Sequence, residues 1–479
     1  MIQRLKRSVT GFFVYKLINA VLSAVEKDSL NLPYIAERLG VKGRFNKLIV
    51  GYARKQLDAK NPSVIMLKNF ATSEPGKKLL KRILSEVNPT CKKKFISNLL
   101  VNSMILGNSQ REGREKKGLP APFLLVISPT MRCNLHCEGC YAGSYTKEED
   151  LPIEVINRVI NEAKKLGVFF ITISGGEPFV RKDLLKIFAK HNDVMFQIYT
   201  NGTLIDKKLA KKLAKLGNAV PAISVEGFKK ETDKRRGKGV FDKVMLAMDN
   251  LRKERVYFGF SATSTRQNIE KFDDRFIDFY IKKGCFFGWF FQYIPIGRNP
   301  DVGLAPTPEQ RNKFRENVHE IRKRKPIFVA DFWNDGLYSN GCMAGGKKYL
   351  HINSKGDVEP CVFVHFAVDN IKDKSLKEVL NSNFFRDIRK MQPFDENLLT
   401  PCMIIDHPAI LREVCEKNNA YPTHEGAESI IKSKKITKYL DLYSKKMGKL
   451  ASNAWKEKYC HFVEKRKKMF EGAKYSIKW

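Results

Sequence analysis

The chain has 479 residues and carries 87 Lys and Arg against 51 Asp and Glu, so its formal net charge at pH 7 is +36. This length accommodates about three domains, and the excess of positive charge favours an anionic partner such as a membrane surface or nucleic acid. The sequence contains no internal repeat and no long low-complexity segment, which excludes a repeat array.

The two ends of the chain are its most basic parts. Residues 1–120 hold 24 Lys and Arg against 8 Asp and Glu, and residues 420–479 hold 15 against 6. We therefore expect a basic, mostly helical N-terminal region over residues 1–118 and a basic helical tail over residues 421–479, on either side of a body of more even charge.

An amphipathic helix is predicted at the start of the chain. Apolar residues from Val9 to Leu22 recur at helical spacing after three basic residues within the first seven positions. Lys16 interrupts the apolar run, which is shorter than the roughly 20 residues that span a bilayer. Two interpretations stay open: a helix that lies in the plane of an anionic membrane, or a helix that packs its apolar face on the protein's own core.

Nucleic acid is the other partner that such a charge would serve. The sequence contains no zinc finger and no RNA-binding fingerprint, and residues 35–41 only weakly resemble the start of a helix-turn-helix. Nucleic acid is therefore an unlikely partner, and a peripheral contact between the basic ends and a membrane is the stronger prediction.

Three cysteines, Cys133, Cys137 and Cys140, lie within eight residues of one another. Three thiolates at this spacing can bind one iron–sulfur cluster and leave one of its four irons without a protein ligand. A structural zinc site fits less well, because closed zinc sites use four ligands, usually in paired short spacings. His136 directly precedes Cys137 and is poorly placed to be a fourth ligand. The motif therefore indicates a cluster with one reactive iron.

A second motif follows about forty residues later in the chain. The apolar runs at 122–128 and 169–174 are both typical of buried parallel strands. The first run ends just before the cysteines, and the second ends in Gly175-Gly176-Glu177-Pro178. Glycines at the end of a strand let the backbone approach a ligand closely, and a carboxylate beside them can bind an ammonium group.

Together the two motifs resemble those of the radical S-adenosylmethionine (radical SAM) enzymes. In that family three cysteines hold a 4Fe–4S cluster, the amino and carboxylate groups of SAM chelate its fourth iron, and the Gly-Gly-Glu-Pro segment binds the same amino group. The resemblance implies an α/β fold, a partial (β/α)6 barrel. It implies that the catalytic, cluster-binding residues are Cys133, Cys137 and Cys140, and that the cofactor-binding residues include Gly175, Gly176, Glu177 and Pro178.

The middle of the chain has the order of elements that such a barrel requires. Six apolar strand candidates alternate with helical stretches up to residue 293, which implies a parallel sheet. The chemistry of such barrels collects at the carboxyl ends of the strands, where Asn201, Ser224 and Glu226 are expected. Ser224 and Glu226 resemble the family segment that lines the SAM ribose, although the usual acid there is Asp. Asn201 lies in a segment whose composition also suits a simple turn. Gly139 replaces the aromatic residue that many relatives place near adenine, so another residue must make that contact.

Four further cysteines form a second predicted site. Cys342 is followed by thirteen residues, Gly356, four more residues and Cys361, and the segment between them is typical of a β-hairpin. This spacing resembles the start of the SPASM or twitch extension of radical SAM enzymes, which carries auxiliary iron–sulfur clusters. Cys402 and Cys415 complete a set of four thiolates, and a full cysteine shell would leave no open iron for a substrate. We therefore expect a redox or structural role, with four unrelated buried thiols as the alternative.

The sequence thus predicts a radical SAM enzyme with its core barrel over residues 119–330 and a twitch/SPASM-like extension over residues 331–420. Its expected cofactors are SAM, one SAM-binding 4Fe–4S cluster and one auxiliary 4Fe–4S cluster, with an external electron donor of flavodoxin or ferredoxin type. Reductive cleavage of SAM would give a 5'-deoxyadenosyl radical that abstracts hydrogen from an unactivated carbon of a peptide, a protein or a membrane lipid. Oxygen-sensitive clusters need a reducing compartment, which predicts the cytoplasm or the inner face of the membrane.

A function of a different class is the alternative: an iron–sulfur electron-transfer or redox-sensing protein that binds nucleic acid without SAM chemistry. The intact Gly-Gly-Glu-Pro segment argues against this hypothesis, because an electron carrier has no need to bind an amino acid.

Overall fold

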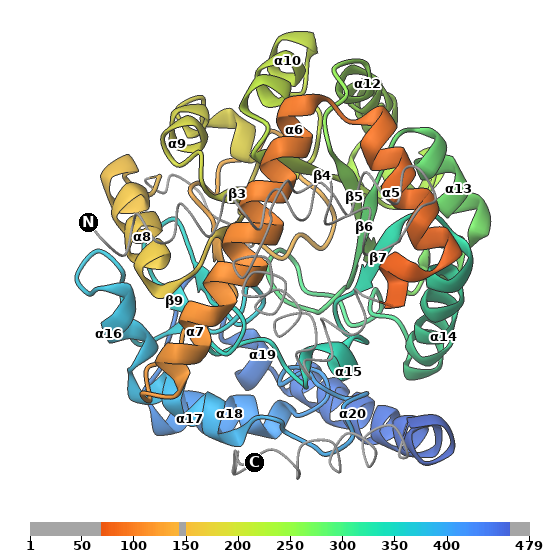
Figure 1. Ribbon diagram of the computed structural model, residues 1–479. Coiled ribbons are helices and arrows are strands. Elements are labelled where there is room, and N and C mark those ends of the chain that lie inside the picture. Colours follow the sequence, from red (N-terminus) through yellow and green to blue (C-terminus); the bar gives the residue numbers. More distant parts are fainter. Residues whose placement is uncertain (1–68, 143–149, 460–479) are drawn as a thin grey trace, which may run out of the picture.

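The computed structural model describes residues 69–142 and 150–459 (Figure 1). The helix predicted at the start of the chain and the last part of the basic tail lie outside the described residues. No helix within the described ranges is both long and apolar enough to cross a membrane.

One sheet of nine strands organises the molecule, in the order β7-β6-β5-β4-β3-β2-β1-β8-β9. Neighbours from β1 to β7 are all parallel. The predicted partial barrel is therefore confirmed, and β7 adds one parallel strand to the six predicted. The strands are β1 Leu124–Ile127, β2 Phe170–Ile173, β3 Met195–Thr200, β4 Ala219–Val225, β5 Gly259–Ser264, β6 Phe287–Gln292, β7 Phe328–Asp331, β8 His351–Ile352 and β9 Val358–Glu359.

Helices between the strands cover the outside of the barrel (Figure 1). The strands are mostly apolar because one face meets these helices and the other meets the barrel interior. Most of these helices bury an apolar stripe, as α8 does with Ile156, Val159, Ile160, Ala163 and Leu166. The helices and short helical turns of the barrel are α8 Ile153–Leu166, η2 Pro178–Val180, α9 Leu184–Lys190, α10 Lys207–Leu216, α11 Lys229–Arg236, α12 Val240–Lys253, η3 Ile269–Lys271, α13 Asp274–Lys282 and α14 Pro308–Arg324.

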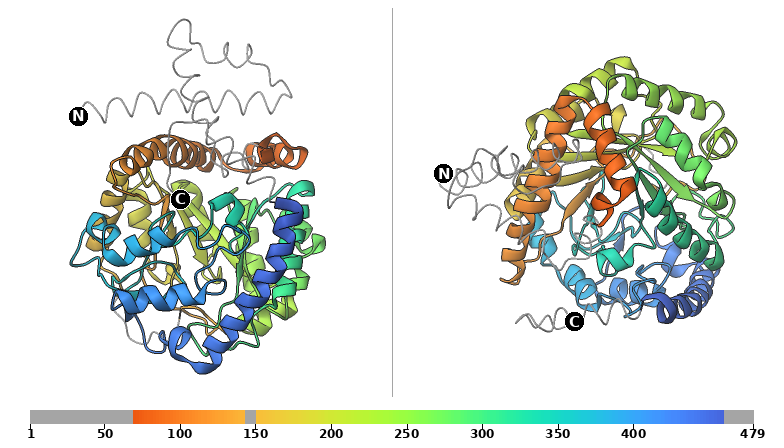
Figure 2. Two further views of the ribbon diagram at one scale, coloured as in Figure 1. Left: turned by 90° about the horizontal axis from the view of Figure 1, so that it is seen from below. Right: turned by 45° about the vertical axis from the view of Figure 1, so that its right-hand side comes forward.

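Helices before the barrel cover the amino ends of its strands (Figure 2). Asn98 donates to Val194 O just before β3, and Arg82 donates to Cys285 O just before β6. The described part of the predicted N-terminal region is helical, and it lies at the end of the barrel opposite the carboxyl ends of the strands. These elements are α5 Glu74–Glu86, α6 Pro89–Lys94, the π-helical η1 Phe95–Gly107 and α7 Asn108–Glu115.

The segment after the barrel continues the same sheet. β8 pairs in parallel with β1, through Val126 and His351, and β9 pairs antiparallel with β8, which confirms the hairpin predicted between Cys342 and Cys361. The long helix α20 packs against α14 along the barrel wall. The remaining elements are α15 Gly336–Ser339, β10 Phe366–Ala367, α16 Leu376–Leu380, α17 Asn383–Met391, α18 Pro408–Lys417, β11 Tyr421–Pro422, α19 Ser429–Lys432, α20 Lys434–Ala454 and η4 Trp455–Tyr459.

Candidate active site

Side chains from β1 to β6 line a cavity of about 210 Å³, called the barrel cavity below. Successive residues of a strand face opposite sides, and the lining follows this alternation, with Leu124 and Val126 from β1 and Trp289 and Phe291 from β6. Loops that follow the strands complete the lining. The cavity therefore occupies the position at which parallel barrels bind their ligands.

The first cysteine motif forms part of the wall of the barrel cavity. Cys133, Cys137 and Cys140 lie in the loop after β1, and all three line the cavity. Cys133 is exposed and the other two are partly exposed, so none of them is sealed in the core. The structure thus brings together the three residues predicted to hold the catalytic cluster.

The glycines after β2 hold the start of the cysteine loop. Gly176 N donates to Thr130 O at 3.0 Å, and Glu177 N donates to Arg132 O at 2.9 Å. A Cβ atom at Gly175 would lie 2.4 Å from Thr130 O, and one at Gly176 would lie 2.3 Å from Arg132 O. Gly175 also has φ +104°, which favours glycine. Both glycines line the barrel cavity, so the lack of a side chain lets the cysteine loop, and any ligand beside it, approach the backbone closely.

The carboxyl group of Glu177 is fully buried and does not line the barrel cavity. It accepts hydrogen bonds from Phe179 N at 3.0 Å, Thr200 Oγ1 at 2.8 Å and Asn201 N at 2.7 Å. Burial raises the pKa of Glu177, and these donors act in the opposite direction. Its oxygens face the end of β3, and the binding of an ammonium group by this carboxylate stays a prediction. Pro178, which is also buried, starts the turn η2 behind it.

Asn201 lines the barrel cavity and contacts the cysteine loop. Its Oδ1 accepts from Thr203 N at 2.9 Å, so its Nδ2 faces the loop and donates to Asn134 Oδ1 at 2.9 Å. The same Nδ2 lies 3.8 Å from Cys133 Sγ. The segment is therefore a turn and also a support for the cysteine loop.

Glu226 is fully buried and, unlike Ser224, does not line the barrel cavity. Its Oε1 accepts from Arg235 Nη1 at 2.7 Å and from Arg236 Nη2 at 2.5 Å. Burial opposes the charge of Arg236, but Glu226 and the nearby thiols Cys137 and Cys140 raise its pKa above the usual value. The structure thus places Glu226 behind two arginines, and its contact with the SAM ribose stays a prediction.

Three arginines that the sequence analysis did not single out line the barrel cavity: Arg235, Arg236 and Arg298. Arg235 O accepts from Glu138 N at 2.9 Å, and Arg298 N donates to Cys140 O at 2.9 Å, so two of them also fix the cysteine loop. In the sequence, the basic run at the end of α11 is indistinguishable from a solvated helix face. The one signal for these arginines in the sequence was the nearby acid Glu226, to which Arg235 and Arg236 donate.

Tyr293, just after β6, fills the space left by Gly139. A Cβ atom at Gly139 would lie 2.5 Å from Tyr293 Cε2, and Gly139 has φ +58°. Tyr293 lines the barrel cavity, and its hydroxyl accepts a hydrogen bond from Asp301 N at 3.0 Å, which fixes the ring. An aromatic ring thus lies beside the third cysteine after all, supplied by the segment that follows β6.

The part of the barrel cavity away from the cysteines is uncharged. Among the described residues that line the cavity, the three arginines are the only charged ones. Asn, Gln, Ser, Thr and Tyr side chains supply the other polar groups. The aromatic residues of the wall include Phe170, Tyr199, Trp289, Phe291, Phe332 and Phe363.

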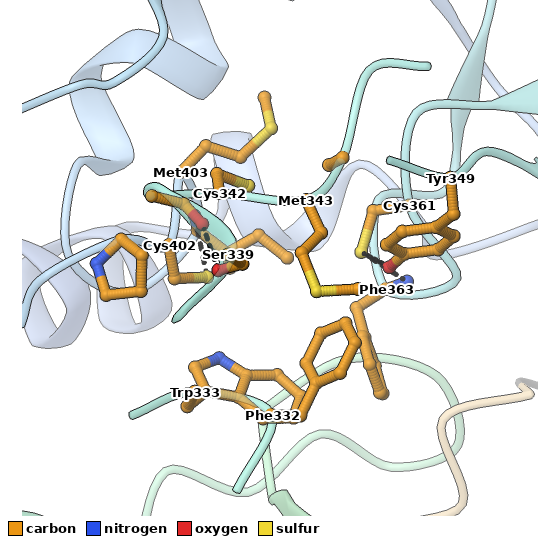
Figure 3. Close-up of a pocket in the computed structure, with 14 residues that line it drawn as sticks. Phe332, Trp333, Ser339, Cys342, Met343, Tyr349, Cys361, Phe363, Cys402 and Met403 are labelled. Carbon is orange, nitrogen blue, oxygen red and sulfur yellow. Dashed lines mark hydrogen bonds between the residues drawn. The ribbon is translucent and has the colours of Figure 1, made fainter. Parts of the chain in front are cut away.

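A second pocket, the auxiliary pocket, contains three of the four remaining predicted ligands: Cys342, Cys361 and Cys402 (Figure 3). Tyr349 Oη and Cys361 Sγ are hydrogen-bonded at 2.7 Å. Burial raises the pKa of all three thiols, that of Cys361 to about 12. Metal ions bind the deprotonated thiolates, so occupation of this pocket by a cluster would release protons.

The backbone supports the sulfurs of the auxiliary pocket in one repeated way. Each sulfur accepts from the N–H of the residue two positions later: Cys342 from Ala344, Cys361 from Phe363 at 3.5 Å and Cys402 from Ile404 at 3.4 Å. Leu135 donates to Cys133 in the first motif in the same way. Such donors stabilise a thiolate.

Cys415 does not line the auxiliary pocket. It lies buried on α18, where burial alone raises the pKa of its thiol to about 12 and no backbone N–H of the above kind reaches its sulfur. The prediction that Cys415 completes a four-thiolate shell is therefore not supported by its position. The spacing of the cysteines along the chain did not reveal this position of Cys415. It depends on the face of α18 that carries the side chain, which is the buried face.

Both cysteine sets fit an iron–sulfur cluster by the chemistry of their donors. Within residues 69–142 and 150–459, no three His, Cys, Asp or Glu side chains are grouped closely enough to hold a single metal ion. A cluster carries one thiolate on each of several irons, so its ligands need not be grouped around one ion.

Comparison with known proteins gives two family matches. Residues 127–274 match the radical SAM superfamily, and residues 342–404 match the iron–sulfur cluster-binding domain called SPASM. The second match begins at Cys342 and ends two residues after Cys402, before Cys415.

Several curated proteins are similar to this chain. The Fe-coproporphyrin III synthase of Methanosarcina barkeri is 34% identical over 51% of this chain and 66% of its own length. The mycofactocin maturase MftC of Mycolicibacterium smegmatis is 32% identical over 58% of this chain and 75% of its own length. The PqqA peptide cyclase of Rhizobium meliloti is 28% identical over 56% of this chain and 76% of its own length.

Among solved structures, Streptococcus suis SuiB bound to S-adenosylmethionine has a TM-score of 0.52. It is 21% identical over 62% of this chain and 76% of SuiB, which supports the fold.

Proposed function

This chain belongs to the radical SAM superfamily, and we propose that its barrel cavity cleaves SAM and directs hydrogen abstraction from an unactivated carbon of a peptide or protein. The chain is an enzyme of radical SAM type, and its cofactors are SAM and 4Fe–4S clusters. One observation carries the proposal: three cysteines, a Gly-Gly backbone and three arginines line the same cavity at the carboxyl ends of the strands.

The residues around the cysteine loop would bind and orient the cofactors. Cys133, Cys137 and Cys140 would hold the first cluster, with Gly175 and Gly176 against the loop. The arginines of the barrel cavity offer charge-assisted donors for the SAM carboxylate. When bound and reduced, the cluster and SAM supply a 5'-deoxyadenosyl radical, which removes a hydrogen atom.

The remainder of the barrel cavity would position the substrate and exclude water. Its aromatic wall contains no Asp, Glu or Lys among the described residues. Such a wall suits an apolar or aromatic group. The reacting part of the substrate is therefore an uncharged carbon centre held against aromatic side chains.

A peptide or protein is the substrate class that we propose. The name of the PqqA peptide cyclase gives a peptide for one relative. The name of the Fe-coproporphyrin III synthase points to a tetrapyrrole for another, and a flat macrocycle would also suit aromatic walls, so a tetrapyrrole is the second candidate. The membrane lipid and the peripheral membrane contact rest on basic ends that lie partly outside the described residues, and they stay predictions, as does a flavodoxin or ferredoxin donor.

Transfer of deuterium into 5'-deoxyadenosine would identify the substrate class. Extracts of the source cells grown in deuterated medium are separated into peptide, lipid and tetrapyrrole fractions. Each fraction is incubated with reduced enzyme and unlabelled SAM, and the mass of 5'-deoxyadenosine is measured. We expect deuterium from the peptide fraction, and we expect prior protease digestion to abolish it.

Two controls make this result specific. A variant with Cys133, Cys137 and Cys140 replaced by Ala should form no 5'-deoxyadenosine, whereas Cys285→Ala, at a buried thiol that lines neither pocket, should form it normally. Deuterium from the tetrapyrrole or the lipid fraction alone would reject the peptide proposal and leave the radical chemistry intact.

A further inference from the structure

Helix α10 presents a row of lysines to solvent, called the basic face below. The helix contains no acidic residue, and it buries Ala210 and Leu213 on one side. Its lysines recur at helical spacing on the other side, where successive turns bring their side chains together. The basic face consists of five exposed residues: Lys207, Lys208, Lys211, Lys212 and Lys215.

The basic face lacks the acidic partners that balance other lysines of the barrel. None of its five side chains forms an ion pair with another described residue. On α11, by contrast, Lys229 pairs with Asp242 at 2.6 Å. Asp206 directly precedes α10, but its carboxylate accepts from Leu209 N at 2.7 Å as the cap of the helix. A row of like charges is most often a solvated face, so its surroundings decide whether it has a partner.

The basic face begins beside the cysteine loop. Asn134 Nδ2 donates to Thr203 Oγ1 at 2.9 Å, and Asn201 Nδ2 lies 3.8 Å from Cys133 Sγ. Lys207 follows Asn201 by six residues in the chain. Because six residues span at most about 20 Å when fully extended, the first lysines lie within that distance of the residue that contacts Cys133.

The cysteine loop has an outer face next to these lysines. The odd-numbered residues from 133 to 139 line the barrel cavity. The even-numbered residues from 132 to 138 are exposed and are not part of that lining: Arg132, Asn134, His136 and Glu138. A partner on this outer face would approach the cysteines without entering the barrel cavity. Leu204, between Thr203 and the basic face in the chain, is 37% exposed and adds an apolar contact of the kind found inside a charged interface rim.

From this arrangement we infer that the basic face and the outer face of the cysteine loop form the docking surface of an acidic electron-transfer protein. The inference rests on the proposed function, because reductive cleavage of SAM consumes one electron. That electron leaves the reduced cofactor of the donor protein, enters the first cluster and is used to break the sulfonium carbon–sulfur bond of SAM. Opposite charge on the donor would speed its encounter with the enzyme by about 10- to 1000-fold.

A redox partner fits this surface better than an anionic membrane does. The lysines would attract either one, but the basic face lies next to the loop that carries the electron acceptor. Small contact areas with charged rims are also typical of electron-transfer complexes, which must form and separate quickly.

The experiment measures binding and electron delivery separately on the full-length, reconstituted enzyme. The probe is purified flavodoxin, an acidic protein whose reduced flavin donates single electrons. The test variant replaces Lys207, Lys208 and Lys211 by Gln, which has nearly the same helix propensity. The matched control makes the same change at three exposed lysines of α20 and η4, on the opposite side of the barrel from α10 (Figure 1): Lys445, Lys449 and Lys456. Calorimetry gives the dissociation constant of oxidised flavodoxin at low and high salt. The yield of 5'-deoxyadenosine is measured with reduced flavodoxin and, separately, with dithionite, a small reductant that needs no docking surface.

We expect the test variant to bind flavodoxin about tenfold more weakly than the native enzyme at low salt. Added salt should reduce this difference, because exposed charges are screened beyond about 10 Å at about 0.1 M salt. The yield of 5'-deoxyadenosine should fall with flavodoxin and stay unchanged with dithionite. The control variant should behave like the native enzyme in every measurement.

Three results would overturn the inference. They are equal binding by the test and control variants, an equal loss of 5'-deoxyadenosine with both reductants, and a native enzyme that dithionite reduces but flavodoxin neither binds nor reduces. Loss of binding to phosphatidylglycerol vesicles in the test variant, with flavodoxin binding unchanged, would assign the basic face to a membrane instead. A native enzyme that forms no 5'-deoxyadenosine with dithionite would reject the proposed function, and the binding comparison would still test the docking surface.

Discussion

Arg311 and Asp406 form a buried ion pair that holds the third ligand of the auxiliary pocket. Arg311 Nη1 and Asp406 Oδ1 lie 2.6 Å apart, Nη2 and Oδ2 lie 3.1 Å apart, and the two side chains are 1% and 0% exposed. Asp406 Oδ2 also accepts from Cys402 N at 3.0 Å. The pair therefore connects α14 of the barrel to the loop that carries Cys402.

Replacement of Arg311 by Met leaves the carboxylate of Asp406 buried without its partner. Breaking a buried pair in this way costs about 3–5 kcal/mol, a large part of the 5–15 kcal/mol that is typical of a folded domain. The Cys402 loop should loosen at the same time. We expect Arg311→Met to lower the free energy of unfolding by about 3–5 kcal/mol and to reduce the iron content of the auxiliary pocket.

Two comparisons isolate the effect of the buried charge. The double variant Arg311→Met/Asp406→Asn removes both charges and keeps an acceptor for Cys402 N, so it should recover much of the lost stability. Arg324, also on α14, pairs with Asp274 at 2.7 Å, but these side chains are 53% and 38% exposed, so Arg324→Met should cost less than about 1 kcal/mol. Urea unfolding of the apoprotein under reducing conditions measures all three. A cost below about 1 kcal/mol for Arg311→Met, or no recovery in the double variant, would refute the reasoning.

Three further predictions follow from single positions. Gly176→Ala should abolish iron binding by the first motif, because its Cβ atom would lie 2.3 Å from a backbone oxygen of the cysteine loop, whereas Gly113→Ala, with nothing within 4 Å, should bind iron normally. Tyr349→Phe should lower the reduction potential of the auxiliary cluster in a redox titration by removing a hydrogen bond to a ligand sulfur, and Tyr257→Phe, at a partly buried ring that lines neither pocket, should leave it unchanged. Burial is the main cause that raises the pKa of Asp331 to about 6, and the neighbouring carboxylate of Asp335 is the next. The folded state thus holds a proton that the unfolded state loses, so stability should fall by up to about 1.4 kcal/mol per pH unit between about pH 4 and 6. Asp331→Asn should flatten this dependence in unfolding measured against pH.

Local patterns were enough to predict the barrel and the first motif. Each barrel strand is a short apolar run with a helix after it, and Cys133, Cys137 and Cys140 lie in one loop, so no distant contact is needed to assemble them. The hairpin between Cys342 and Cys361 was predictable for the same reason, because its turn and both strands are adjacent in the chain.

The roles of the acids depended on contacts that spacing does not reveal. Glu177 meets Thr200 from the next strand, and Glu226 meets arginines from the following helix, so both carboxyl groups are directed away from the barrel cavity. Tyr293, from the segment after β6, compensates for Gly139, and the helix that carries Cys415 keeps it out of the auxiliary pocket. In each case tertiary packing decides which way the side chain points.

The central claim is that Cys133, Cys137 and Cys140 support cleavage of SAM in the barrel cavity. Its most direct test is the amount of 5'-deoxyadenosine that anaerobically reconstituted, dithionite-reduced enzyme forms from SAM, compared with a variant in which these three cysteines are Ala. The account predicts 5'-deoxyadenosine from the native protein and none from the variant, which should still fold and retain the iron of the auxiliary pocket. Formation of 5'-deoxyadenosine by the variant, or its absence from native protein that holds both clusters, would contradict the account.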